Sequence, residues 1–304
     1  MEADTTQVAR GRFAVSAETF ALLSYFALGA LFLIVVSGAT VRLTGSGLGC
    51  DNWPRCGSSF LPEKNFHALV EYGNRGVGFV VGLVSLAAAI AATRVERIPR
   101  WLLWGAWALP FTVLAQGILG GITVIFELHP LIVMAHFLLS LLALAVAVLV
   151  ALGARDFAQG AVMHPPLAAN WLAVVLVPSA AALIATGTLV TAAGPHSGGE
   201  KIRRYGLLPD ALHVHVGAAA IFGIAFLGIV ASLLWRRDEA RADLLFAGAV
   251  LALLLVQMAV GDVQWREHLP WPLVLAHVTL ATAVWVGVVA LAARLLLRSR
   301  PVLP

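Results

Sequence analysis

Long apolar segments separated by short polar stretches run along almost the whole chain. Eight of these segments are long enough to cross a hydrocarbon core of about 30 Å as helices. None has the alternating pattern of about ten residues that marks a transmembrane barrel strand. We therefore predict eight transmembrane helices, at Phe20–Val41, His67–Ala92, Trp101–Val124, Pro130–Gly153, Asn170–Ala192, Pro209–Trp235, Ala242–Val263 and Trp271–Leu297.

Composition supports an all-α membrane protein surrounded by lipid. Of the 304 residues, 60% are hydrophobic and only 12% are charged, whereas soluble domains carry roughly 25% charged residues. A surface in water cannot be built from so little charge, so the apolar excess must face membrane lipid. The 20 Lys and Arg residues are scattered, which excludes nucleic acid as a partner, and two cysteines are too few for a disulfide-rich mini-protein.

Basic residues gather at one set of predicted helix ends. Twelve Arg residues fall at the ends that include both termini, and seven Lys or Arg residues fall at the opposite ends, diluted by acidic residues. Cytoplasmic ends of membrane proteins carry the excess of Lys and Arg. We therefore expect a multi-pass protein with both termini in the cytoplasm and the Cys50–Cys56 loop on the outer side.

The chain repeats itself at a fixed offset of 141 residues (277 minus 136). The matched pairs are Gln116 with Gln257, Gly120 with Gly261, Leu128 with Leu269, His136 with His277 and Asn74 with His215, while Ser37–Val41 matches Thr186–Val190 at 149. Because each half holds an even number of spans, the halves run in the same direction as parallel repeats. We predict a four-helix half at 1–153, a cytoplasmic linker at 154–168 and a second four-helix half at 169–304.

Imidazole and amide side chains lie at one depth in four of the predicted spans. Asn74, His136, His215 and His277 each lie six or seven residues into a span that starts on the outer side, which is about 10 Å below the outer interface. A helix bundle presents side chains in this way when it holds a flat cofactor between facing helices. Neutral imidazole is the usual axial ligand of haem iron, and no Cys, Asp or Glu joins His215 and His277 at that depth to make a zinc site.

Only the first half carries charged residues squarely within a span, away from its ends. Glu71 lies one turn before Asn74, and Arg75 lies four residues after Glu71; their repeat counterparts are Leu212 and Val216. The pair can simply neutralise itself, but a carboxylate beside a bound substrate can also take a proton or stabilise developing positive charge. We therefore expect chemistry in the first half and electron handling in the second.

Cys50 and Cys56 lie in the first outer loop with five residues between them. An outer loop faces an oxidising compartment, where such a pair can close a disulfide. Two alternatives are an unbonded buried pair and a metal pair, although two thiolates alone do not complete a zinc site.

Several motifs together resemble the haem A synthase family over about residues 20–295. They are Val41–Cys50 with Trp53, Pro54 and Cys56, then Glu71-Tyr72 with Asn74-Arg75, Gly194–Gly198, and the two Gln-to-His blocks that end at His136 and His277. The resemblance implies an eight-helix enzyme of the bacterial plasma membrane that oxidises a methyl group of haem O to a formyl group, giving haem A for terminal oxidases.

The resemblance also implies roles for individual residues. His215 and His277 match the axial ligands of a haem b, His136 a ligand of the substrate haem O, Glu71 the essential carboxylate, and Cys50 with Cys56 the loop disulfide. Asn74 departs from the pattern, because the family usually has His there and an amide is a poor iron ligand. Arg75 is a further cofactor-binding candidate, and Arg42, Arg75, Arg203 and Arg204 are alternatives for binding the haem propionates.

The implied reaction needs an electron route through the second-half haem from a donor that the sequence does not identify. The haem O-forming enzyme is an expected partner from the pathway, and the oligomeric state stays open, a homo-oligomer included. Two rival functions remain: a di-haem electron carrier of cytochrome b type, and a transporter built from parallel repeats. The transporter is disfavoured because the polar residues cluster at one depth instead of forming a path across the bilayer.

Overall fold

Eight long helices make up the computed structural model, which describes residues 14–50, 52–57, 59–164, 171–196, 202 and 204–301. All eight are long and apolar enough to cross a membrane, which confirms the predicted fold class. They are α1 (Ala17–Leu43), α2 (Phe66–Ala92), α3 (Arg100–Ile125), α4 (Pro130–Ala158), α5 (Trp171–Ala193), α6 (Leu208–Trp235), α7 (Arg241–Arg266) and α8 (Trp271–Leu296).

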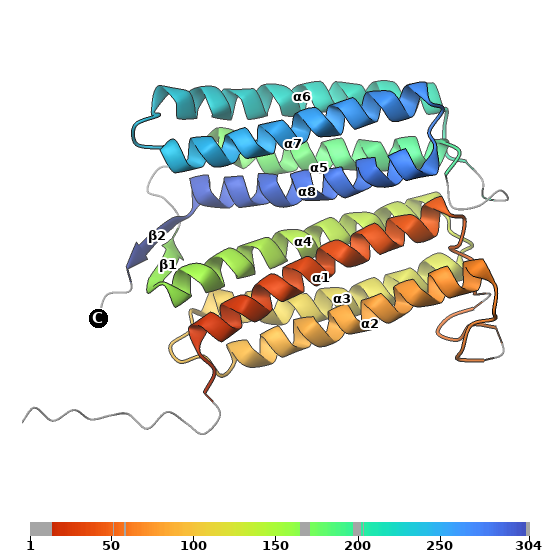
Figure 1. Ribbon diagram of the computed structural model, residues 1–304, viewed down its shortest axis with the longest axis horizontal. Coiled ribbons are helices and arrows are strands. Elements are labelled where there is room, and N and C mark those ends of the chain that lie inside the picture. Colours follow the sequence, from red (N-terminus) through yellow and green to blue (C-terminus); the bar gives the residue numbers. More distant parts are fainter. Residues whose placement is uncertain are drawn as a thin grey trace, which may run out of the picture.

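The helices form two groups of four (Figure 1). In the first group α1 packs on α2, α2 on α3, α3 on α4, and α4 back on α1; helices α5 to α8 make the same closed cycle. The groups meet where α8 packs against α1 and α4, and α4 also contacts α5. At this seam the buried Trp285 indole on α8 donates a 2.8 Å hydrogen bond to the Leu141 carbonyl on α4.

Local sequence explains where the helices begin. The Ser16 hydroxyl accepts from the Thr19 amide to cap α1, and the Asn65 side chain accepts from the Ala68 amide to cap α2, as these residue types do at helix N-termini. Helices α4, α6 and α8 instead carry proline in their first turn, where a missing amide proton costs no helical hydrogen bond.

Two inter-helix loops have the same backbone geometry. The chain leaves α3 through Glu127 and Leu128 and leaves α7 through His268 and Leu269, all four with positive φ. The Leu128 amide donates to the Thr123 carbonyl at 2.8 Å, and the Leu269 amide donates to the Gln264 carbonyl at 2.7 Å. These turns place the first residues of α4 and α8, and with them His136 and His277, at equivalent positions.

Large apolar side chains cover the sides of the helix bundle, where lipid would surround it. Trp104 on α3 is 70% exposed, Ile224 on α6 is 74% exposed and Met258 on α7 is 67% exposed. Such a surface is stable in hydrocarbon and not in water, so the pattern fits a multi-pass membrane protein.

A short two-stranded ladder, which the sequence did not predict, follows α4 and α8. Strand β1 (Ala161–His164) pairs antiparallel with β2 (Arg298–Pro301). It lies at the end of the molecule where α1 begins (Figure 1). Much of the predicted linker 154–168 is therefore structured. Helix α4 includes the first five linker residues and ends at Ala158, and β1 follows at Ala161–His164. Residues 165–168 lie outside the described part of the chain.

Candidate functional site

Four polar side chains inside the bundle each lie opposite a glycine. A β-carbon built on Gly187 would lie 3.1 Å from the His215 Cε1 atom, and one on Gly261 would lie 3.0 Å from the His277 Cε1 atom. In the first half the corresponding distances are 3.4 Å from Gly120 to the His136 Cε1 atom and 4.0 Å from Gly38 to the Asn74 amide oxygen. The four glycines thus leave room for three rings and an amide between neighbouring helices.

The second half orients His215 through its backbone surroundings. The His215 Nδ1–H group donates to the Leu183 carbonyl at 3.1 Å, and the Thr186 hydroxyl lies 3.2 Å from the same nitrogen. A hydrogen bond of this kind at Nδ1 fixes the tautomer that leaves the Nε2 lone pair available to iron. The geometry of His215 therefore fits an axial ligand.

The His277 ring is less fully oriented than the His215 ring. Its Nδ1 atom is buried without a hydrogen-bond partner, and the Gln257 side-chain nitrogen lies 3.2 Å from its Nε2 atom. An iron atom bound at Nε2 would require the Gln257 amide to rotate away. Within the described residues no group of three or more His, Cys, Asp or Glu could hold a metal ion, so the pair fits haem iron better than zinc.

The first half supplies one imidazole and one amide. The Ser37 hydroxyl donates a 2.7 Å hydrogen bond to the Asn74 Oδ1 atom, so this amide already joins α1 to α2. His136 is held through its backbone, because its carbonyl accepts from the Gln116 amide at 3.0 Å, while its Nδ1 atom is buried without a partner. The donor set fits a haem bound through a single histidine.

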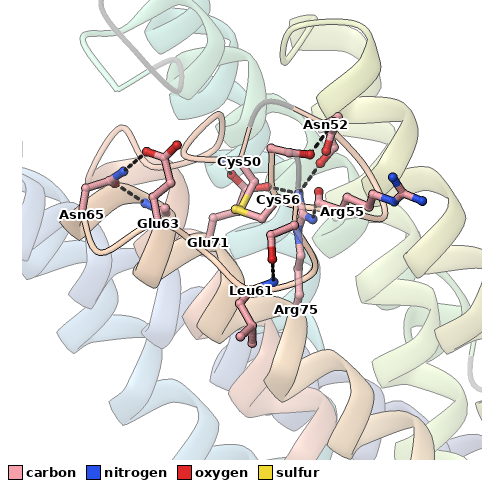
Figure 2. The surroundings of a disulfide bond; sticks show 12 residues. Cys50, Asn52, Arg55, Cys56, Leu61, Glu63, Asn65, Glu71 and Arg75 are labelled. Carbon is pink, nitrogen blue, oxygen red and sulfur yellow. Dashed lines mark hydrogen bonds and ion pairs between the residues drawn. A yellow bond between two sulfur atoms is a disulfide. The ribbon is translucent and has the colours of Figure 1, made fainter.

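Glu71 and Arg75 anchor the loop between α1 and α2 (Figure 2). Glu71 is 5% exposed; one of its carboxylate oxygens accepts from the Cys50 amide at 2.9 Å and the other pairs with Arg75. The Arg75 guanidinium also donates to the carbonyls of Asn52, Pro54 and Arg55, at 3.0–3.2 Å. The pair is therefore not only a self-neutralising bridge, since it also holds four backbone groups of the loop.

The predicted disulfide between Cys50 and Cys56 is confirmed, so the unbonded pair and the metal pair are excluded. Trp53 of the same loop lies against α3, where a β-carbon on Gly121 would come within 2.7 Å of its ring. Gly121 is next to Gly120, the glycine opposite His136. The loop therefore covers the outer end of the first-half site.

Several contacts escaped the sequence reasoning. The Ser37 and Thr186 hydroxyls occupy matched positions at the 149-residue offset, and each bonds the polar residue of the next helix, Asn74 or His215. That offset was the available signal, but it does not reveal which way a hydroxyl points. A second contact that the sequence did not predict joins Arg42 to His196. The Arg42 Nε atom donates to the His196 carbonyl at 3.2 Å. Arg203 lies outside the described residues, and Arg204 is exposed.

Comparisons with known proteins agree with these features. A family model described as cytochrome oxidase assembly protein (COX15-CtaA) matches residues 21–66 and 61–197. A protein of Symbiobacterium thermophilum named "Heme A synthase" is 31% identical over 271 residues, which cover 84% of this chain and 88% of the relative. Proteins with the same name from Bacillus pumilus and Bacillus licheniformis are each 32% identical, over 43% and 40% of this chain and 43% and 41% of the relatives. The chain therefore belongs to the haem A synthase family.

Proposed function

We propose that this protein is a haem A synthase, an enzyme that oxidises a methyl group of haem O to the formyl group of haem A for terminal oxidase assembly. The observation that carries the proposal is the difference between two otherwise similar halves. In both halves, polar side chains lie opposite glycines of a neighbouring helix. Only the first half also has Glu71, Arg75 and a disulfide-closed loop. The family relationship supports the same reaction.

The second half would hold haem b between His215 and His277, where the bound group supplies one-electron transfer. His215 has the hydrogen bond to Leu183 that a ligating imidazole needs. A hydrogen bond of this kind orients the ring and raises its basicity as a ligand. The donor that delivers those electrons stays unidentified.

The first half would hold haem O through His136, with Asn74 and Arg75 nearby on α2. The loop contacts keep water out of the outer end of this site, because Trp53 covers Gly121 and Arg75 fixes the loop backbone. We assign Glu71 two tasks: it anchors the Cys50 amide, and its carboxylate assists the oxidation by accepting a proton or stabilising positive charge.

The proposal extends to location and partners. The excess of Arg at the helix ends where the chain starts and finishes supports a bacterial plasma membrane protein with both termini in the cytoplasm. Haem O is the substrate and haem A the product, the haem O-forming enzyme would supply the substrate, and assembly as a homo-oligomer is compatible with the lipid-facing surface.

One experiment tests the reaction directly. The chain is co-expressed with a haem O-forming enzyme, and the non-covalent haems are extracted and separated by chromatography with mass detection. We expect haem A in these cells and none when a Glu71→Ala variant replaces the wild type. The contrary outcome is that the cells contain haem O and no haem A while their membranes show a normal low-spin haem spectrum. That outcome would identify the protein as an electron carrier of cytochrome b type instead.

A further inference from the structure

Arg42 is held at the outer end of α1 by the second half of the molecule. Its Nε atom donates to the carbonyl of His196, in the segment between α5 and α6. The His196 ring in turn donates from Nε2 to the Leu269 carbonyl, in the loop between α7 and α8, at 2.7 Å. The guanidinium is thus fixed in position by two loops that belong to neither α1 nor its bundle.

One terminal nitrogen of this guanidinium, Nη2, lacks a hydrogen-bond partner. The Arg42 Nη2 atom is buried and makes no hydrogen bond, and none of the four ion pairs found among the described residues includes Arg42. A buried cation without a counter-charge is costly in a protein and more so beside lipid. A side chain that is anchored through Nε and left open at Nη2 is arranged to receive an anion.

Other described cations at this end of the molecule are already engaged or exposed. Arg75 is used by three loop carbonyls and by Glu71. Arg266 pairs with Asp262, and its side chain is 72% exposed. Arg42 is the cation here that combines burial with a free donor, so it is the candidate that the geometry selects.

Arg42 lies on the same face of α1 as Gly38, the residue opposite Asn74 in the first half. Arg42 lies one turn beyond Gly38, the residue of α1 that faces Asn74, so its α-carbon is about 6 Å further toward the outer surface. A haem held by His136 beside Asn74 would need a cation for its carboxylates, and Arg42 is a cation at the end of α1 nearest this site. The propionates of haem are its only anionic groups and belong at the edge that meets a cation.

We propose that Arg42 binds a propionate carboxylate of the haem in the first half, and that His196 holds Arg42 in place for this contact. The assignment rests on the proposed function, because it takes haem O as the first-half ligand. It links the two halves physically, since the residue that would bind the substrate haem is positioned by loops of the second half.

The test compares haem b with its dimethyl ester, which lacks the anionic carboxylates. Both are titrated by absorbance into protein in nanodiscs that carries His215→Ala and His277→Ala together, so that binding reports on the first half. With Arg42 present, haem b should bind about tenfold more tightly than the ester, and Arg42→Gln should remove that preference while leaving ester affinity unchanged. Arg42→Lys should recover part of it, His196→Ala should reduce it less than Arg42→Gln, and the control Arg266→Gln should leave it intact.

Two results would overturn the assignment. One is a preference for haem b that survives in Arg42→Gln, and the other is an equal loss of haem b and ester binding, which would indicate a structural role. The binding test is independent of turnover. If the preference depends on Arg42 but wild-type protein makes no haem A, the carboxylate site stands and the synthase proposal fails.

Discussion

The two halves of the molecule have the same framework and different polar residues at equivalent positions. Each half is a closed cycle of four helices, and each places a glycine opposite the polar residue of a neighbouring helix. The turns at Leu128 and Leu269 have the same conformation and the same closing hydrogen bond. These recurrences support our proposal that the chain consists of two parallel repeats.

Three of the differences fall near the start of the second helix in each half. Asn74, with its amide bonded to Ser37, stands where the other half has His215. Glu71 and Arg75, which hold the disulfide loop, match apolar residues in α6. The comparison indicates that two similar four-helix frames can present two imidazoles in one half, and one imidazole, one amide and an anchored loop in the other.

The largest effect is expected from removing a ligand in the second half. We expect His277→Ala to abolish the low-spin spectrum of a bis-histidine haem, because one imidazole cannot hold the iron in six-coordinate form. His136→Ala is the matched variant at the same repeat position and should keep that spectrum while losing haem A formation. The measurement is the absorbance and electron paramagnetic resonance of purified protein; a low-spin signal that depends on His136 instead would reverse the assignment of the halves.

Asn74→His would make the first half resemble the second. A ring at this position, with its Nδ1 atom near the Ser37 hydroxyl as His215 is near Thr186, would add a second imidazole opposite His136. We expect a second low-spin haem signal in the same two spectroscopies. Asn74→Gln serves as the control and should add none. If Asn74→His leaves the spectrum unchanged, the two polar residues of the first half do not face a common haem.

Loop anchoring should have an intermediate effect. Arg75→Gln removes an ion pair to a buried carboxylate and hydrogen bonds to three carbonyls, so we expect about 2–4 kcal/mol of lost stability in the loop region. Thermal unfolding and protease cleavage between the cysteines measure this loss. The exposed Glu63→Gln variant in the same loop should show neither effect.

Glu71→Gln separates the two tasks of the carboxylate. A Gln oxygen can still accept from the Cys50 amide, so the loop should stay protected from protease more than in Glu71→Ala. Haem A formation should nevertheless fall, because the amide cannot accept a proton. A Glu71→Gln variant with full haem A formation would leave Glu71 with the anchoring task alone.

The parts of the structure that follow from a linear pattern could be predicted. Eight spans follow from the length of apolar runs, and the Cys50–Cys56 bond follows from two cysteines in one outer loop. The contacts of Arg42 with His196 and of Arg75 with loop carbonyls could not be predicted, because they depend on which elements meet at the outer surface. The β1–β2 ladder was missed for a similar reason: each strand has four residues, too few to show a periodicity.

The smallest effects should come from adding a methyl group to the facing glycines, and their order follows from distance. At Gly261 the added carbon would lie 3.0 Å from the His277 ring and must displace it, whereas at Gly120 it would lie 3.4 Å from the His136 ring, within the reach of small adjustments. Gly261→Ala should therefore shift the low-spin spectrum and lower the unfolding midpoint by about 2 °C, as expected for a loss of about 1 kcal/mol in a chain of this size. Gly120→Ala should have a smaller effect, and Gly38→Ala, at 4.0 Å from the Asn74 amide, should have none. Equal effects at Gly261 and Gly38 would mean that the glycines serve helix packing in general and not the rings beside them, because only ring crowding predicts this order.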